Sequence, residues 1–186
     1  MRLTLTFAAI GISFLIVVSC KKSNAPASNV VTGNWNFVNM STQTQVTAIQ
    51  SGDTSVSYAN YVTQNNAGSI DFTIDTMSVS GLAYSVSTTF TTYFYYMGVA
   101  YDTVTSPLST SLPATSMSSG YKLIGNDSLY FASGGLLPSG LTSSSAGQGA
   151  RFVISGDTLR LTVQATDTTT GQIEVGHGVI TLVRQL

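Results

Sequence analysis

His177 is the one histidine of the chain, and it is the side chain best suited to acid–base chemistry near neutral pH. It lies between two glycines in an alternating segment that predicts a strand, on the same face as Val175 and Val179. A hydrolase would need a serine nucleophile beside His177 and a carboxylate to orient the ring, for which the candidates are Asp157, Asp167 and Glu174. No Gly-x-Ser-x-Gly segment presents such a serine. We therefore expect no enzyme and interpret His177 as a strand residue.

Metal chemistry has few candidate ligands in this sequence. One histidine and one cysteine are too few for a His/Cys metal site. Asp53, Asp127 and Asp157 stand next to Gly, Asn, Ser or Thr, where their side chains can bond the local backbone of a turn. We predict turns rather than calcium sites at these positions, and no cofactor.

Cys20 ends an apolar stretch, Leu3 to Val18, that follows Arg2. This stretch is close to the roughly 7–15 apolar residues of a signal-peptide core and shorter than the ~20 that span a bilayer. Val17-Val18-Ser19-Cys20 resembles the lipobox of bacterial lipoproteins, in which the cysteine is acylated, for example by palmitate, and becomes the first residue of the mature chain. The resemblance implies a signal peptide over 1–19 and a membrane anchor at Cys20. The alternative is an ordinary secretory signal whose cysteine is incidental.

The composition argues against a nucleic-acid partner. Only 8% of the residues are charged, and without Arg2 six of the seven basic residues remain against eight acidic ones. Phosphate binding needs several clustered cations, and the only basic pair is Lys21-Lys22. That pair could touch anionic lipid headgroups beside the anchor or belong to a solvated linker. With Cys20 acylated, no cysteine remains for a disulfide.

The sequence predicts three parts of the chain: the signal peptide over 1–19, a tether and one domain. Residues 20–29, with Pro26 among small polar neighbours, predict a flexible tether after the acylated cysteine. Residues 30–186 predict one all-β domain, because β-branched and aromatic residues alternate with polar ones and turn residues recur every eight to twelve positions. The predicted strands are Asn34–Met40, Gln43–Gln50, Ser69–Ile74, Met77–Ser80, Ala83–Ser87, Thr91–Met97, Val99–Val104 and Ile173–Val183.

A local repeat gives the clearest strand signal. Lys122–Phe131 and Phe152–Leu161 match at Ile, Asp, Ser/Thr and Leu, and each reads as a strand, a tight turn and a second strand. Two segments rich in Ser, Gly and Pro, Ser106–Ser119 and Ser133–Gly149, predict long loops. Consecutive hairpins predict an antiparallel meander that closes into a β-barrel, with a β-sandwich as the alternative.

Gly33-Asn34-Trp35 opens the first predicted strand and resembles the Gly-x-Trp signature of lipocalins. In that family the Trp closes the base of an eight-stranded barrel and an Arg at the end of the last strand packs over it. The resemblance implies that Gly33, Trp35 and Arg184 close the barrel here, and cation–π stacking gives the pairing of Trp35 with Arg184 a physical basis. The whole arrangement resembles the lipocalin-like lipoproteins of Bacteroidota. It departs from lipocalins in having no disulfide, no Thr-Asp-Tyr signature and no segment for a C-terminal helix.

Tyr93-Phe94-Tyr95-Tyr96 is the densest aromatic run, and a strand would put Tyr93 and Tyr95 on one face and Phe94 and Tyr96 on the other. In a barrel one pair would point inward, and we take Tyr93 and Tyr95 as the candidate ligand-binding residues. Packing of one face in the core, with the other on a half-exposed hairpin, is the alternative.

These observations predict a monomeric, lipid-anchored lipoprotein of the cell envelope that binds a small apolar or amphipathic ligand inside a lipocalin-like barrel. The alternative is a structural or interaction lipoprotein that contacts a protein or glycan through its loops. Surface-exported members of the lipoproteins that the chain resembles often carry acidic residues just after the cysteine. None occurs here before Asp53, so the resemblance implies the periplasmic face of the outer membrane.

Overall fold

The computed structural model of the chain describes residues 31–132 and 147–185. The predicted signal peptide, Cys20, the predicted tether and residues 133–146 of the second predicted loop lie outside the described residues. The described part is all β, with no helix and nine strands. These are β1 Gly33–Gln50, β2 Asp53–Val62, β3 Gln64–Phe72, β4 Thr76–Tyr96, β5 Val99–Ile124, β6 Ser128–Phe131, β7 Gln148–Ser155, β8 Thr158–Thr169 and β9 Gln172–Arg184.

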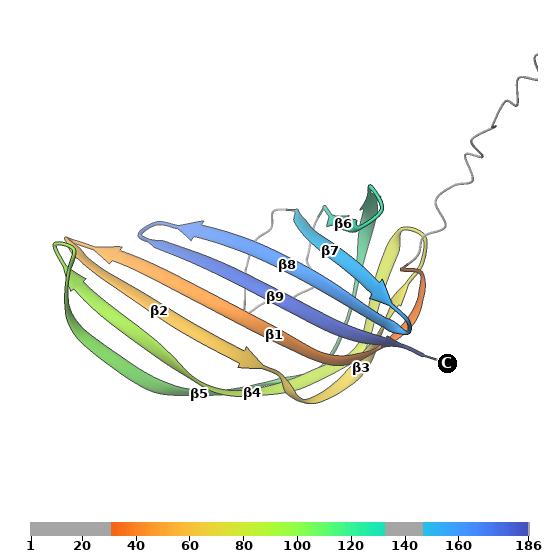
Figure 1. The fold of residues 1–186 in the computed structure, drawn as a ribbon, viewed down its shortest axis with the longest axis horizontal. Helices are drawn as coiled ribbons and strands as arrows, with labels where there is room; N and C mark the ends of the chain where they lie inside the picture. The colour runs from red at the N-terminus through yellow and green to blue at the C-terminus, as the bar shows by residue number, and fades with distance from the viewer. Residues whose placement is uncertain (1–30, 133–146, 186) are drawn as a thin grey trace, which may run out of the picture.

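The strands form one antiparallel meander whose last strand pairs with its first (Figure 1). β2 and β3 lie end to end between β1 and β4, because each of them pairs with β1 on one side and with β4 on the other. A ring of hydrogen-bonded strands therefore passes through eight of the described strands, from β1 through β3 and on to β9. Each strand has neighbours on both sides in some part of its length, which leaves few open edges.

The two ends of the molecule differ in how many strands reach them. The near end carries the C-terminus, at the right of Figure 1, and includes the short strands β6 and β7, of 4 and 8 residues. The far end carries the β1–β2, β4–β5 and β8–β9 turns, and only β8, β9, β1, β2, β4 and β5 extend to it. β5 is 26 residues long, yet it pairs with β6 only from Tyr121 onward.

The core fills the ring at the near end. Alternate residues of each strand point inward there, and the largest buried side chains include Trp35, Phe72, Phe131, Met77 and Leu182, all below 2% exposure. Burial of one such side chain stabilises the fold by about 1.5–3 kcal/mol, so this end supplies most of the apolar stabilisation. Toward the far end the inward positions of β1 change from Trp and Phe to Thr, Val and Ala.

The structure confirms the meander and both predicted hairpins, whose turns join Ile124 to Ser128 and Ser155 to Thr158. The strand boundaries differ elsewhere. The predicted strands Asn34–Met40 and Gln43–Gln50 are one strand, β1, and three predicted segments merge into β4. β2 has no counterpart among the predicted strands.

The prediction of a loop over Ser106–Ser119 is wrong, because these residues lie within β5. There β5 pairs with β4 alone among the described strands, and an edge strand tolerates proline because its missing N–H can face the open side. Pro113 falls at a register irregularity, between the pairs Leu112–Tyr84 and Thr115–Leu82. In the other predicted loop, Gln148 and Gly149 are strand residues of β7.

Candidate functional site

Gly33, Trp35 and Arg184 come together where the first and last strands meet. Trp35 is fully buried and pairs in register with Arg184, whose guanidinium carbon lies 4.4 Å from the indole centroid. The indole Nε1 donates to the Val31 carbonyl at 2.9 Å, so the polar edge of the ring is satisfied. Gly33 has φ +123°, and a Cβ there would lie 3.1 Å from Arg184 Nη1. Glycine thus allows both the backbone turn and the arginine's approach.

The inner face of the far end is the first candidate site. It continues the inward side of the core strands past Met40, through Thr42 and its register partner Tyr61. Strand alternation and register place a mixed set of side chains beyond that pair: Thr44, Val46, Ser57, Ala59, Phe90, Thr92, Phe94, Val104, Ala165, Asp167 and Glu174. Ser57 and Thr92 share a 2.7 Å hydrogen bond between their hydroxyls. The face therefore combines aromatic rings with hydroxyl groups.

Titratable groups on this face have shifted pKa values. Burial raises the pKa of Glu174, and the charge of Asp167, its register partner on β8, raises it further. Burial also raises the pKa of Tyr61; the Thr42 hydroxyl lowers it, while Tyr84 and Glu174 raise it. The carboxylates Asp167 and Glu174 lie toward the far end, and Tyr61 and Tyr84 lie toward the core. The polarity of the inner face thus increases from the core outward.

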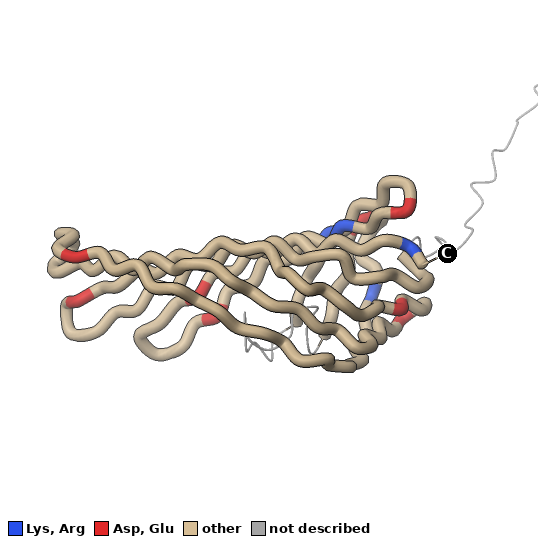
Figure 2. The backbone as a smooth tube through the Cα atoms, turned by 90° about the horizontal axis from the view of Figure 1, so that it is seen from below, with Lys and Arg blue, Asp and Glu red and all other residues tan. Residues whose placement is uncertain are grey.

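Charge is distributed unevenly along the molecule. Figure 2 shows Lys and Arg only toward the end that carries the C-terminus, where Lys122, Arg151, Arg160 and Arg184 belong to strand segments of the near end. The far end holds the acidic residues Asp53, Asp102, Asp167 and Glu174 and no basic residue among those described. An anionic ligand would meet repulsion at the far end.

Tyr93 and Tyr95 lie on the outer face of β4, so the inward pair is Phe94 and Tyr96. Val86 and Thr92 are buried on the inward side. No register shift separates them from Phe94, so Phe94, an even number of residues away, also faces inward. Tyr93 contacts Tyr58 of β2 edge-on, with ring centroids 6.0 Å apart. The identity of the inward pair depends on this parity, which the aromatic run by itself does not reveal.

Two adjoining hollows open on the outer face near Tyr93. One, of about 390 Å³, is lined by Ser41, Thr42, Gln43, Asn60, Tyr61, Val62, Gln64, Ser87 and Thr88. The other, of about 370 Å³, is lined by Tyr58, Asn60, Thr88, Thr89, Thr91 and Tyr93. Both lie beside a break in the sheet, where the β2–β4 pairing ends at Ala59–Phe90 and β4 next pairs at Gln64–Ser85. We call the two hollows together the side groove.

The side groove was not predicted from the sequence. Its central strand, β2, was absent from the predicted strands, although Val56-Ser57-Tyr58-Ala59 has the β-branched and aromatic content of a strand. The break in pairing depends on Thr63, whose Oγ1 accepts from Met40 N while its own N–H donates to Met40 O, both at 2.9 Å. Such a long-range exchange leaves no signal in local composition.

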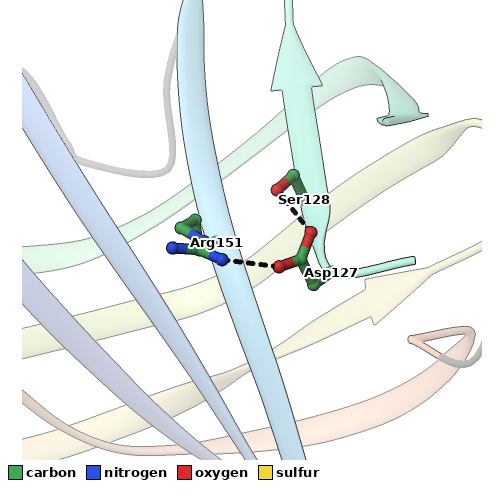
Figure 3. A network of polar contacts seen from close by, with 3 residues as sticks. All are labelled: Asp127, Ser128 and Arg151. Carbon is green, nitrogen blue, oxygen red and sulfur yellow. Dashed lines mark hydrogen bonds and ion pairs between the residues drawn. The ribbon is translucent and has the colours of Figure 1, made fainter. Parts of the chain in front are cut away.

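A third hollow, of about 400 Å³, lies across β6 to β9, and His177 is among its lining residues. His177 is exposed and pairs in register with Gln43 and Gln164, so its neighbours across the sheet are amides. Arg151 and Ser128 also line this hollow. Arg151 Nη2 donates to Asp127 Oδ2 at 2.8 Å, and Ser128 Oγ donates to Asp127 Oδ1 at 2.9 Å (Figure 3). These bonds, Arg151 first, lower the pKa of Asp127. Asp127 is therefore an ion-pair partner as well as a turn residue.

Within the described residues, no group of three or more His, Cys, Asp or Glu side chains is arranged to hold a metal ion. The described part of the chain also contains no helix long and apolar enough to cross a membrane. Comparison of the chain with protein-family models, curated proteins and solved structures found no match. Function must therefore be argued from the geometry.

Proposed function

We propose that the chain is a lipid-anchored lipoprotein of the cell envelope whose lipocalin-like β-barrel carries a small apolar or amphipathic ligand. Cys20 would carry the acyl anchor in the outer membrane, facing the periplasm, and the domain would act as a monomer without catalysis. The signal-like segment and Val17-Val18-Ser19-Cys20 support the anchor. The strand ring and the stacking of Arg184 on Trp35 support the lipocalin-like barrel.

The observation that carries the ligand proposal is the change in polarity along the inner face. Phe37 and Tyr84 meet at 6.2 Å between centroids at the core side, and beyond them the face passes through hydroxyls to Glu174. An amphipathic molecule would place its apolar part against Phe90 and Phe94 and its polar part toward the far end. The acidic far end favours a neutral or cationic polar group.

Two other functions have less support. The interaction alternative uses the predicted loops Ser106–Ser119 and Ser133–Gly149; the first is strand, and residues 133–146 of the second lie outside the described residues. A hydrolase would need His177 beside a carboxylate, whereas its cross-strand partners are Gln43 and Gln164. We therefore propose that the protein is not an enzyme.

The test compares molecules that copurify with three forms of the full chain, processed in its host and extracted in the same mild detergent. Ala165→Trp adds bulk on the inner face, and Gln164→Trp adds the same ring on the outer face of the same strand. Organic extracts analysed by mass spectrometry should contain a discrete compound with the wild type and Gln164→Trp, and at least tenfold less with Ala165→Trp. No such compound with the wild type, or equal amounts with both variants, would contradict the proposal.

A further inference from the structure

We propose that the side groove is a binding site for a short neutral oligosaccharide, separate from the inner-face site. The groove lies on the outer face, between β2 and β4, and joins two hollows that share Asn60 and Thr88. Each hollow has a volume within the ~300–1,000 Å³ typical of small-ligand sites. The proposal is independent of the ligand on the inner face.

The groove exists because the sheet is interrupted there. Between Ala59–Phe90 and Gln64–Ser85 no register pair joins β4 to β2 or β3, while its pairing with β5 continues. The Thr88 hydroxyl donates to the Asn60 carbonyl at 2.8 Å, in place of a backbone donor. A side-chain bond across a sheet leaves more space than a backbone ladder. The hollow therefore reaches inward-facing residues, Thr42 and Tyr61, from the outer surface.

Thr42 gives this hollow a polar floor next to the Tyr61 phenol. The side chain is 2% exposed and lines the hollow, and its Oγ1 makes no hydrogen bond of standard geometry. The Tyr61 phenol is a polar neighbour, since the Thr42 hydroxyl lowers the pKa of that group. A buried hydroxyl with unused hydrogen-bonding capacity is stabilised by a further partner. A ligand hydroxyl that reached Thr42 would satisfy it as donor or acceptor.

The rim of the groove supplies the other groups that bind sugars. Gln43 and Asn60 are register partners with exposed amides, each of which both donates and accepts hydrogen bonds. Tyr58 and Tyr93 are 44% and 37% exposed and line the second hollow. A pyranose ring presents C–H groups on one face, which pack against aromatic rings because the ring faces are electron-rich. The hydroxyls at the ring edge would then face the amides.

The ligand should be uncharged. Every described residue that lines the two hollows is uncharged, so an anion or a cation would lose its hydration without a counter-charge. The basic residues of the described part lie toward the end that carries the C-terminus (Figure 2). This distribution disfavours acidic glycans, phosphates and nucleic acids.

The experiment titrates the processed full chain in detergent, by isothermal calorimetry, with maltohexaose, cellohexaose, laminarihexaose and β-1,4-mannohexaose, and with polygalacturonate as the charged comparison. At least one neutral hexasaccharide should bind, and polygalacturonate should not. Tyr93→Ala should weaken that binding at least tenfold. The matched control is Tyr130→Ala, which removes an exposed outer-face tyrosine from a different hollow and should leave affinity unchanged.

Thr42→Val is the sharper variant, because valine has nearly the same shape and lacks the hydroxyl. It should bind the hexasaccharide at least threefold more weakly, and its urea midpoint reports separately on any change in stability. The proposal is overturned if none of the four hexasaccharides binds, if polygalacturonate binds more tightly than all of them, or if Tyr130→Ala weakens binding as much as Tyr93→Ala.

Discussion

At the scale of single residues, the contact between Trp35 and Arg184 joins the first strand of the domain to the last. The chain has one Trp, Trp35, which is buried at the near end with Arg184 stacked over it. Arg184 Nη1 also donates to the Thr32 carbonyl at 3.4 Å. The arginine therefore links β9 to the segment that precedes β1, and its loss should be felt in global stability.

We predict that Arg184→Met lowers the free energy of unfolding by about 1 kcal/mol, the scale of a partly desolvated cation–π contact. Methionine keeps much of the apolar stem, so the change isolates the guanidinium. Urea denaturation followed by the fluorescence of Trp35 measures the difference. Arg160→Met, at an exposed position of β8, is the matched control and should change the value little. Equal effects of the two variants would contradict a special role for Arg184.

Glu174 should make stability depend on pH. Its pKa is raised in the folded protein by burial and by Asp167, so the native state holds the proton to higher pH than the unfolded chain does. Stability from this group is fully present below the unfolded pKa of about 4.3 and is lost as pH rises through the folded pKa. Glu174→Gln should therefore gain stability over the wild type as pH rises from 4 to 7. A constant difference across that range in urea titrations would contradict the assignment.

At the scale of elements, the junction of β2 and β3 shapes the wall of the molecule. Thr63 exchanges hydrogen bonds with Met40, Asn65 has φ +52°, and Gly68 has φ +108°. These features place extra residues opposite β1 and β4 and produce the register shifts of β3. The irregularity opens the side groove without breaking the ring.

Gly68 should be the most sensitive glycine of that junction. A Cβ there would lie 2.7 Å from the backbone N and Cα of Leu82, in addition to the positive φ. We predict that Gly68→Ala costs about 2–3 kcal/mol or more, because strained backbone costs about 1–3 kcal/mol before any clash. Gly98→Ala is the control: φ is +81°, nothing lies within 4 Å of its Cβ, and about 1–2 kcal/mol is expected. Urea midpoints rank the two variants, and a larger loss for Gly98→Ala would refute the argument.

At the scale of the whole molecule, the apolar core and the proposed inner-face site lie at different ends. The large buried side chains gather at the near end, where β6 and β7 complete the ring, and the far end carries polar and acidic groups. Core packing therefore does not compete with the proposed inner-face site. The domain starts at the near end, so an anchor at Cys20 would tether the near end to the membrane and leave the far end toward solvent (Figure 1).

The anchor itself gives a simple prediction. The full chain should enter the membrane fraction of its host and incorporate labelled palmitate, because several acyl chains at about 0.8 kcal/mol per buried CH₂ hold a protein at a bilayer. Cys20→Ala should abolish the label and release the mature chain from the membrane fraction. A control variant, Ser23→Ala, keeps the cysteine and should behave as the wild type. Label retained in Cys20→Ala would contradict lipidation at that residue.

Local pattern was sufficient to predict the all-β class and the meander. Period-two alternation and tight Gly, Asn and Asp turns are short-range signals, and both hairpins around Gly125 and Gly156 were predicted from them. The meeting of Gly33, Trp35 and Arg184 was expected from a family resemblance, and the structure brings the three together. The prolines of Ser106–Ser119 led to the wrong prediction of a loop, because composition does not reveal that a strand lies at an edge.

The sequence by itself determined the strand character, the turns and the low charge, since these follow from each residue and its neighbours. Only the tertiary structure decided which faces turn inward and where the wall opens. Tyr93 faces outward because the register of β4 with β2 and β5 sets its parity, and a one-residue shift would reverse it. The side groove depends on contacts such as Thr63 with Met40 and Thr88 with Asn60, which join residues more than twenty positions apart. Such pairings arise only when the ring closes, because closure fixes which distant backbone groups remain to be satisfied.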